Sequence, residues 1–162
     1  MNRALALTLL LFGSGFGTTL GEELETDVMR EVTGSLVALS TPDVARATKW
    51  YEEKLGFYAV KAGRMGKGLQ FSLLRHEDNV VELIQNPQAQ PLEKAVPGIK
   101  EPFEVYGIFK LGFTVRKFDQ VFGELKRRGV KVDFEVTQLN DLGMRAFGIR
   151  DVDGNLIQFF GK

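Results

Sequence analysis

Short apolar segments and one helical segment alternate along residues 34–86. Residues 34–41 contain an apolar run at 36–39 that includes β-branched Val37, which predicts a short strand. Between Pro42 and Gly56, apolar residues instead recur at intervals of three or four, which predicts one buried helix face, with Thr41 as its cap. Three more strands are predicted at about 57–63, 68–75 and 80–85, because turn residues separate them. The first half of the chain therefore has the order βαβββ.

The same order occurs a second time. Four of the five prolines lie between residues 86 and 104, and this composition predicts a linker. After it, a strand is predicted over 106–115, a helix over 118–128 and strands at about 130–136, 143–150 and 155–160. We therefore expect an α+β fold of two βαβββ modules within residues 34–161: module one (34–86), a linker (87–104) and module two (105–161).

The two-residue period assigns each predicted strand two faces. The apolar set that should face the helices is Val37, Leu39, Val81, Leu83, Phe109, Leu111, Phe113, Val115, Ile157 and Phe159. The other set mixes polar and apolar residues: Leu36, Ala38, Ser40, Val80, Glu82, Ile84, Ile108, Lys110, Gly112, Thr114, Leu156, Gln158 and Phe160. A mixed face of this kind is typical of a concave surface that binds a ligand. It would equally suit a face that meets another subunit, and the two interpretations are compatible.

The first 21 residues have a different pattern from the rest. Arg3 precedes a nine-residue, mainly apolar stretch at 4–12, and Gly, Ser and Thr then lead to Gly21, with acidic residues from Glu22. This layout predicts a secretory signal peptide over 1–21, with cleavage after Gly21. The apolar run is shorter than the roughly 20 residues of a membrane span. The protein is thus expected to be exported, either periplasmic or secreted. A buried N-terminal helix and an uncleaved anchor are the alternatives.

Charge and composition exclude several classes of site. Basic and acidic residues number 21 each, which argues against the electrostatic footprint of a nucleic-acid-binding protein. Cysteine is absent, so disulfides, thiol nucleophiles and Cys-ligated zinc are excluded. His76 is the single histidine, so no site can draw two histidines from one chain. Its place beside a predicted turn favours a solvated histidine.

Four segments in order carry a resemblance to a known family. They are LVALSTPDVARATKWYEEKLGF (36–57), VVELI (80–84), GIFKLGFTV (107–115) and DVDGNLIQFF (151–160). This set resembles the vicinal oxygen chelate superfamily, which includes glyoxalase I, bleomycin-resistance proteins and extradiol dioxygenases. The resemblance implies a half-open barrel of two βαβββ modules around a central cleft. It also implies frequent homodimers, in which one cleft can be completed by modules from different subunits.

The resemblance implies where metal ligands would lie in metal-dependent members. Mapped by motif, the four positions here are Leu36, Glu82, Lys110 and Gln158. Leucine offers no donor atom and a protonated lysine repels a cation, which leaves two oxygen ligands for a transition metal. We therefore expect no metal and no other cofactor.

Lys110 and Glu82 are expected to share the cleft, and three roles remain open for them. They can form an ion pair in place of the metal. Alternatively, Lys110 can hold an anionic group of a ligand while Glu82 and Gln158 form hydrogen bonds to it. Glu82 can also act as a catalytic base beside Lys110. Arg145 is a further candidate for the mouth of the cleft.

The sequence thus predicts an exported domain that binds a small molecule in its cleft without metal, as bleomycin-resistance-type proteins do by resemblance. One alternative is a lyase, isomerase or epimerase of glyoxalase type with an altered site. The other is an interaction protein with a vestigial cleft. The expected partners are a small molecule and a second copy of the chain, with neither nucleic acid nor, after signal cleavage, a membrane.

Overall fold

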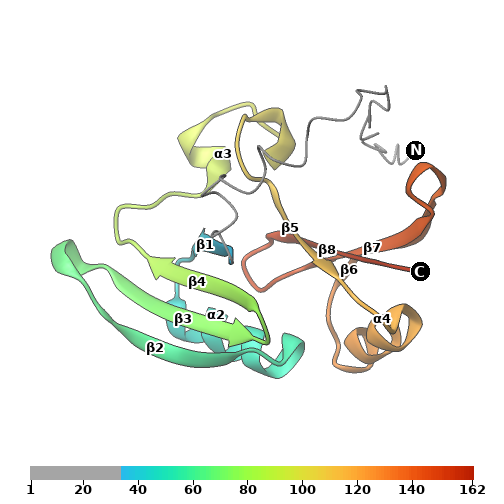
Figure 1. The fold of residues 1–162 in the computed structure, drawn as a ribbon. Helices are drawn as coiled ribbons and strands as arrows, with labels where there is room; N and C mark the ends of the chain where they lie inside the picture. Colours follow the sequence, from blue (N-terminus) through green and yellow to red (C-terminus); the bar gives the residue numbers. More distant parts are fainter. Residues whose placement is uncertain (1–33) are drawn as a thin grey trace, which may run out of the picture. The chain divides into compact units, whose positions relative to one another are not determined.

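The chain forms two four-stranded sheets that repeat one topology (Figure 1). The structure is a computed structural model that describes residues 34–162, and the predicted signal peptide lies outside these residues. The strand orders are β1-β4-β3-β2 and β5-β8-β7-β6. The first strand of each module in the sequence pairs in parallel with the last: β1 with β4, and β5 with β8. The expected α+β fold of two βαβββ modules is therefore confirmed.

The predicted elements appear in the predicted order in both modules. Module one contains β1 (Leu36–Ser40), α2 (Val44–Trp50) with the π-helical turn η2 (Tyr51–Leu55), β2 (Tyr58–Arg64), the 3₁₀ turn η3 (Gly66–Gly68), β3 (Gln70–His76) and β4 (Asn79–Gln85). Module two contains β5 (Lys110–Thr114), α4 (Phe118–Arg127), β6 (Val132–Leu139), the 3₁₀ turn η5 (Asn140–Leu142), β7 (Met144–Arg150) and β8 (Leu156–Gly161). The linker carries only α3 (Leu92–Ala95) and the 3₁₀ turn η4 (Pro102–Glu104).

The first helix begins later than the sequence suggested. Asp43, and not Thr41, is its N-cap, and the Asp43 side chain accepts a hydrogen bond from the amide of Arg46. An N-cap aspartate satisfies one of the amides that the first helical turn leaves without a partner. The Thr41 hydroxyl instead donates to Asp153 of module two at 2.6 Å.

β5 is also shorter than predicted, because it begins at Lys110 and not at residue 106. Among the strands of residues 34–162, β5 pairs with β8 alone, and the first paired residue of β8, Leu156, lies opposite Lys110. Residues before Lys110 therefore have no strand partner. Phe109 accordingly does not face α4, as the pattern suggested, but packs on Phe103 of the linker at 6.2 Å between ring centroids.

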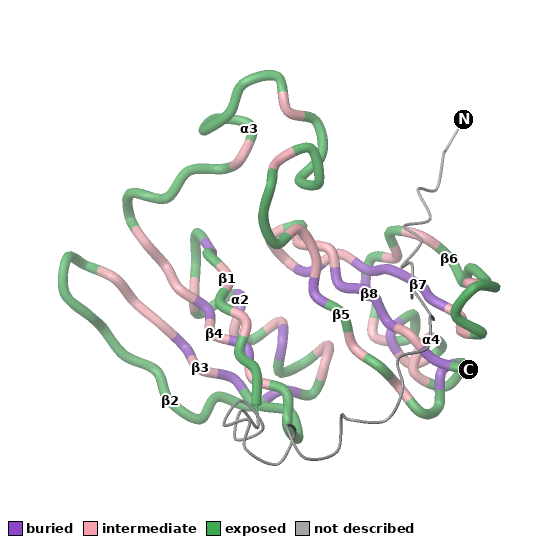
Figure 2. The backbone as a smooth tube through the Cα atoms, turned by 45° about the horizontal axis from the view of Figure 1, so that its top comes forward, coloured by how far each residue is buried: buried purple, intermediate pink, exposed green. Residues whose placement is uncertain are grey.

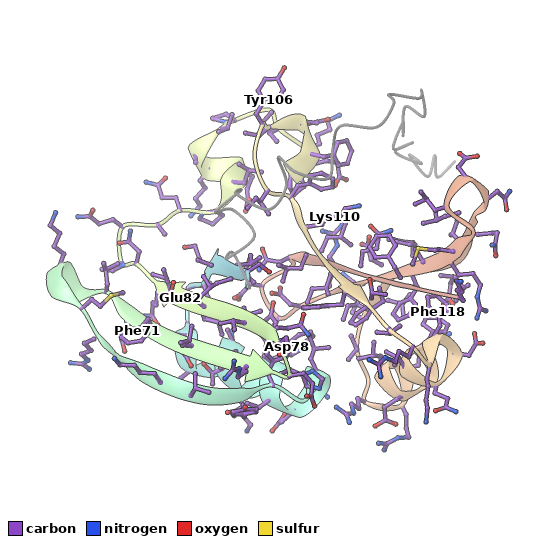
Figure 3. The ribbon with its side chains drawn as sticks, viewed as in Figure 1. Phe71, Asp78, Glu82, Tyr106, Lys110 and Phe118 are labelled. Atoms are coloured by element: carbon purple, nitrogen blue, oxygen red, sulfur yellow. The ribbon has the colours of Figure 1, made fainter. Side chains whose placement is uncertain are left out.

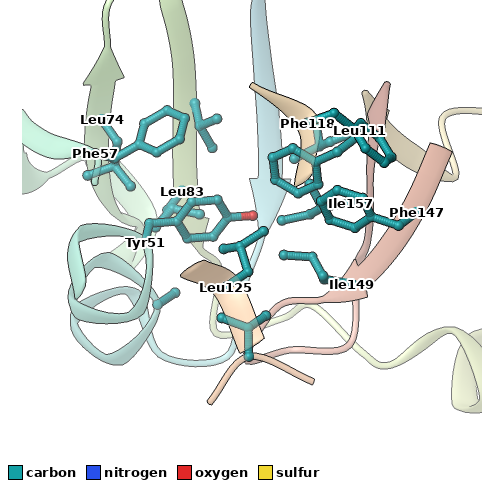
Figure 4. Close-up of a cluster of buried hydrophobic side chains, with 14 residues drawn as sticks. Tyr51, Phe57, Leu74, Leu83, Leu111, Phe118, Leu125, Phe147, Ile149 and Ile157 are labelled. Carbon is teal, nitrogen blue, oxygen red and sulfur yellow. The ribbon is translucent and has the colours of Figure 1, made fainter. Parts of the chain in front are cut away.

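One hydrophobic core joins the helix-facing sides of both sheets (Figure 4). The alternation predicted most of its members: Val81, Leu83, Leu111, Ile157 and Phe159 are buried, with Val37, Leu39, Phe113 and Val115 packed around them. Figure 2 shows more and less buried positions alternating along β1, β3 and β4, whereas β7 and β8 are buried over consecutive positions and β2 is exposed along its whole length. Because this core takes one face of each sheet, the other face is turned away from it.

A buried polar contact links the two modules within this core. The Tyr51 hydroxyl donates to Asp151 at 3.0 Å, and both side chains are buried. Asp151 also accepts two amide hydrogen bonds from the β7–β8 turn, from Asp153 and Asn155. Burial and the neighbouring carboxylate raise the pKa of Tyr51, so this hydroxyl stays a donor.

No helix among residues 34–162 is both long and apolar enough to cross a membrane.

Candidate functional site

On the face of the second sheet that is turned away from the core, Gln158 lies between two glycines. In the sheet register Gln158 lies opposite Gly112 of β5 on one side and opposite Gly148 of β7 on the other. Lys110 lies two residues before Gly112 on β5, which places it on the same face. Gln158 is only 9% exposed, and Lys110 is half-buried.

The first sheet repeats this register with different side chains. Glu82 lies opposite Ala38 of β1 and Leu73 of β3, and Leu36 lies two residues before Ala38. Leu36 is 50% exposed and Glu82 is half-buried. The four positions that the sequence mapped by motif thus occupy matched places in the two modules.

Lys110 and Gln158 form the polar centre of the second face. The Lys110 ammonium donates to the Gln158 amide oxygen at 2.6 Å. The same ammonium lies 5.5 Å from the ring centre of Phe109 and 5.8 Å from that of Phe160. Aromatic rings attract a cation at such distances but do not neutralise it. A positive charge with a neutral partner is therefore held on a largely apolar surface.

The two glycines allow aromatic rings to lie beside Gln158. A β-carbon on Gly148 would lie 2.2 Å from the ring of Phe134, and one on Gly112 would lie 3.3 Å from the ring of Phe160. The absence of both side chains therefore leaves room for these rings on the sheet. Sequence reasoning placed Phe160 on this face but missed Phe134, because β6 contains register shifts on both sides of Phe134 that break the two-residue period.

Glu82 has no polar partner among residues 34–162. It forms no hydrogen bond or ion pair there, and its neighbours across the sheet are Ala38 and Leu73. Glu82 and Lys110 lie on different sheets (Figure 3). The ion pair between them, which the sequence left open, is not formed within the described part of a single chain.

Arg145 does not lie on the face that carries Gln158. It shares the helix-facing side of β7 with Phe147 and stacks over Phe118 of α4 at 4.6 Å. Its guanidinium donates to both carboxylate oxygens of Asp119, at 2.9 and 3.0 Å, and these hydrogen bonds lower the pKa of Asp119. The prediction that Arg145 lines the cleft is therefore corrected: Arg145 anchors α4 to the second sheet.

The donor set at the four mapped positions does not fit a metal ion. Leu36 has no lone pair to offer, and Lys110 presents a cation that already donates to Gln158. Within residues 34–162, no three His, Asp or Glu side chains come close enough to hold an ion.

A groove of about 1020 Å³ borders the Lys110 end of this face. It lies between the linker, the ends of β1 and β5, and the β7–β8 turn, and Lys110 is among its lining residues, whereas Glu82 and Gln158 are not. The charged groups Arg46 and Asp153 at its edge are paired with each other. The groove gives a ligand room beside Lys110.

The sequence as a whole matches a described family. The model of the Glyoxalase/Bleomycin resistance protein/Dioxygenase superfamily matches residues 35–159. The chain belongs to this superfamily. The resemblance drawn from the four ordered segments is thereby confirmed. Among curated proteins, none matches the sequence significantly.

Several solved structures share the fold of the chain. TioX from Micromonospora sp. ML1 is 17% identical, with 80% of this chain and 98% of TioX covered and a TM-score of 0.60. A glyoxalase family protein from Enterococcus faecalis is 21% identical, with 81% and 97% covered and a TM-score of 0.63. A glyoxylase/bleomycin resistance protein/dioxygenase domain from Frankia sp. EAN1pec is 17% identical, with 80% and 90% covered and a TM-score of 0.62. At these identities the likeness concerns the fold alone.

Proposed function

We propose that this member of the superfamily binds an anionic small molecule in its cleft, without metal, through Lys110 and Gln158. The observation that carries the proposal is the Lys110–Gln158 hydrogen bond, which lies beside the Phe160 ring on the sheet face turned away from the core. In a vestigial cleft, the charged side chains would be expected to form ion pairs with each other. Lys110 instead has a neutral partner, which leaves its positive charge available.

The donors at this site suit a carboxylate or a phosphate. An ammonium has three donors, and Lys110 uses one of them on Gln158. With its oxygen engaged, the Gln158 amide nitrogen has no hydrogen-bond partner among the described residues. A ligand anion placed here would accept charge-assisted hydrogen bonds from Lys110 and a further bond from Gln158. The rings of Phe134 and Phe160 would contact the apolar part of the ligand.

A second copy of the chain would complete the cleft. The first sheet leaves large apolar side chains in water, since Leu36 is 50% exposed and Tyr58 53%. Ile108, just before β5, is 82% exposed. In a homodimer, the first sheet of one chain would cover the second sheet of its partner, as occurs in the superfamily. Glu82 would then lie across from Lys110 and Gln158 and would form hydrogen bonds to the ligand.

The proposal includes export. The sequence pattern of residues 1–21 supports a signal peptide, and the absence of cysteine is compatible with a mature domain of this size that folds without disulfides. N-terminal sequencing of the protein from its host should begin after Gly21. A soluble cytoplasmic pool that retains Met1 would refute export and would leave the cleft proposal untouched.

Native mass spectrometry of the purified protein tests the binding site. We expect a small anion to co-purify with a dimer and to be lost from Lys110→Met. Lys49→Met is the matched control, because Lys49 is a solvated helix residue whose only ion pair, with Glu53, is 3.7 Å long. Ligand retained equally by both variants would contradict the proposal.

A double-mutant cycle tests whether the dimer brings Glu82 and Lys110 together. If they share a cleft, Lys110→Met with Glu82→Gln should cost less stability than the sum of the single changes, by more than about 0.5 kcal/mol. The coupling should rise with protein concentration, because it depends on association. Additive effects at every concentration would place the two residues in separate environments.

Glu82 supports an enzymatic function as a second candidate. A half-buried carboxylate without a polar partner, between Ala38 and Leu73, is suited to accept a proton from a substrate. Lys110 across the dimer would then stabilise the negative charge that forms. A co-purified ligand that the parent converts and that Glu82→Gln binds unchanged would establish catalysis, whereas a ligand that neither converts would leave binding as the function.

A further inference from the structure

A second crevice is lined by other residues than Lys110, Gln158 and Glu82. It has a volume of about 560 Å³, which is within the usual range of small-molecule sites. Its walls come from η2, the β3–β4 turn, the end of β5 and one side of α4. None of the four positions mapped by motif lines it.

The floor of the crevice is a row of aromatic rings. Phe57 and Phe113 lie 6.1 Å apart between ring centres, and Phe113 and Phe159 lie 5.7 Å apart. At the turn end, the ring of His76 continues the row, 5.6 Å from Phe57. Val121 and Leu125 of α4 complete the apolar surface. Successive rings of the row are tilted by 40–55° to one another, so an aromatic ligand placed beside them would meet both ring edges and ring faces.

The rim of the crevice is positively charged. Lys54, Lys117 and Arg128 line it against a single carboxylate, that of Glu124. Arg128 donates to Glu124 at 2.7 Å, and Arg127 binds the same carboxylate at 2.7 and 2.6 Å. Glu124 is therefore fully committed to arginines and leaves the rim with an excess of positive charge.

Lys117 is the cation at this rim that remains available. The Lys54 ammonium is engaged by the backbone carbonyl of Arg128, whereas Lys117 forms no ion pair or side-chain hydrogen bond with any residue of 34–162. Gln120, one turn along α4, also lines the crevice. An ammonium and an amide above an aromatic floor are the groups that orient a carboxylate.

From these contacts we propose that the crevice is a second binding site, which takes a small aromatic carboxylate. The ring system lies against the half-buried side chains of Phe113 and Val121, beside the largely buried rings of Phe57 and Phe159. The carboxylate is held by Lys117 and Gln120. His76 closes the turn end of the site. This site is independent of the cleft proposed above, because the two share none of the residues named for either.

Titration with 2-naphthoate, followed by amide chemical shifts in NMR, tests the site. The titration is made in the Lys110→Met protein, so that binding in the cleft does not contribute. We expect saturable shifts at Asn79, Gln120 and Val121. The neutral analogue 2-naphthamide should bind roughly fivefold more weakly, because it lacks the charge that Lys117 recognises.

Two variants and one control separate this site from adventitious binding. Lys117→Gln should lower the affinity for 2-naphthoate roughly fivefold and leave the affinity for 2-naphthamide unchanged. Val121→Trp should abolish binding of both compounds, because the larger side chain would fill the crevice. Lys126→Gln, on the same helix but paired with Glu135, should change neither. Lys117→Gln is a surface change that leaves the core intact, so the test stands even if Val121→Trp fails to fold.

The proposal is overturned if 2-naphthoate produces no saturable shifts at these residues. It is equally overturned if 2-naphthamide binds as tightly as 2-naphthoate, or if Lys117→Gln and Lys126→Gln have the same effect. Such a result would leave the cleft proposal intact, because that rests on Lys110 and is measured by native mass spectrometry, which compares the parent protein with Lys110→Met and Lys49→Met.

Discussion

Modules one and two have the same backbone and different chemistry at the same positions. Glu82 in module one and Gln158 in module two have the same place in their sheets, each flanked by one residue of the first strand and one of the third. The flanking residues are Ala38 and Leu73 in module one, but they are glycines in module two. Hydrogen-bonded strand pairing determines the position of each side chain on the sheet, whereas the type of residue at that position can differ between the modules.

The largest expected effect comes from giving both modules metal-binding side chains. Leu36→His, Lys110→His and Gln158→Glu, with Glu82 retained, would supply two imidazoles and two carboxylates at the matched positions. We expect micromolar Zn²⁺ affinity, about 8 kcal/mol, measured by calorimetry, and a tighter dimer in the presence of zinc.

The control omits Leu36→His and should bind zinc far more weakly, because one module then contributes a single ligand. The parent protein is predicted to bind none stoichiometrically after dialysis. A folded triple variant with no more affinity than the parent would mean that the two faces do not meet in one cleft.

A smaller effect is expected where the two modules are joined. Asp151→Ala should lower the free energy of unfolding by about 2–4 kcal/mol, because it leaves the Tyr51 hydroxyl and the amides of the β7–β8 turn without their acceptor. Denaturant unfolding measures the change. Asp141→Ala, at the exposed turn after β6, should stay within about 0.5 kcal/mol of the parent. Equal costs for the two changes would show that the contact does not hold the modules together.

The glycines that distinguish module two give the next prediction. Gly148→Ala should lower the free energy of unfolding by about 1–3 kcal/mol, because the new β-carbon would overlap the Phe134 ring, only 2.2 Å away. Leu73→Ala at the matched place in module one should cost only about 1 kcal/mol, since Leu73 is half-exposed in one chain. Adding Phe134→Leu should restore part of the loss from Gly148→Ala. No restoration would mean that the ring is not what the alanine meets.

The smallest expected effect concerns acid stability and belongs to the helix of module two. Hydrogen bonds from Arg127 and then Arg128 lower the pKa of Glu124 from 4.5 to about 2. A folded-state pKa below the unfolded value contributes stability above pH 4.5, and this contribution is lost as the pH falls towards 2. Glu124→Gln should remove this part of the acid dependence, measured by urea unfolding across that window. Because the Glu124 side chain is 38% exposed, the change should be small, and identical curves would rule it out.

The fold could be predicted from the sequence because its periodicities are local. The two-residue alternation through Leu111, Phe113, Ile157 and Phe159 fixed which strand face joins the core, and the structure buries or packs all of them there. The four mapped positions followed from motif order, since each lies within a short strand. These features depend only on a few consecutive residues.

Features that depend on pairing between strands could not be predicted. The sheet face on which Arg145 lies depends on the register between β7 and β8, in which Arg145 pairs with Gly161. The β7–β8 turn sets that register. Phe134 lies between two register shifts of β6, so counting by twos along the sequence misplaces it. The Lys110–Gln158 bond likewise needs the parallel pairing of β5 and β8, whose residues are 48 positions apart. Such information is distributed over long sequence separations.

The linker between the modules carries little of what holds them together. Pro87 to Gln90 are exposed, whereas the Tyr51–Asp151 bond and the shared core lie elsewhere. A protease that cuts the chain there would leave two fragments, each with its own four-stranded sheet and each needing the other to bury its core. The chain would then behave as a heterodimer of its own halves, and the halves expressed separately should reassemble by fragment complementation.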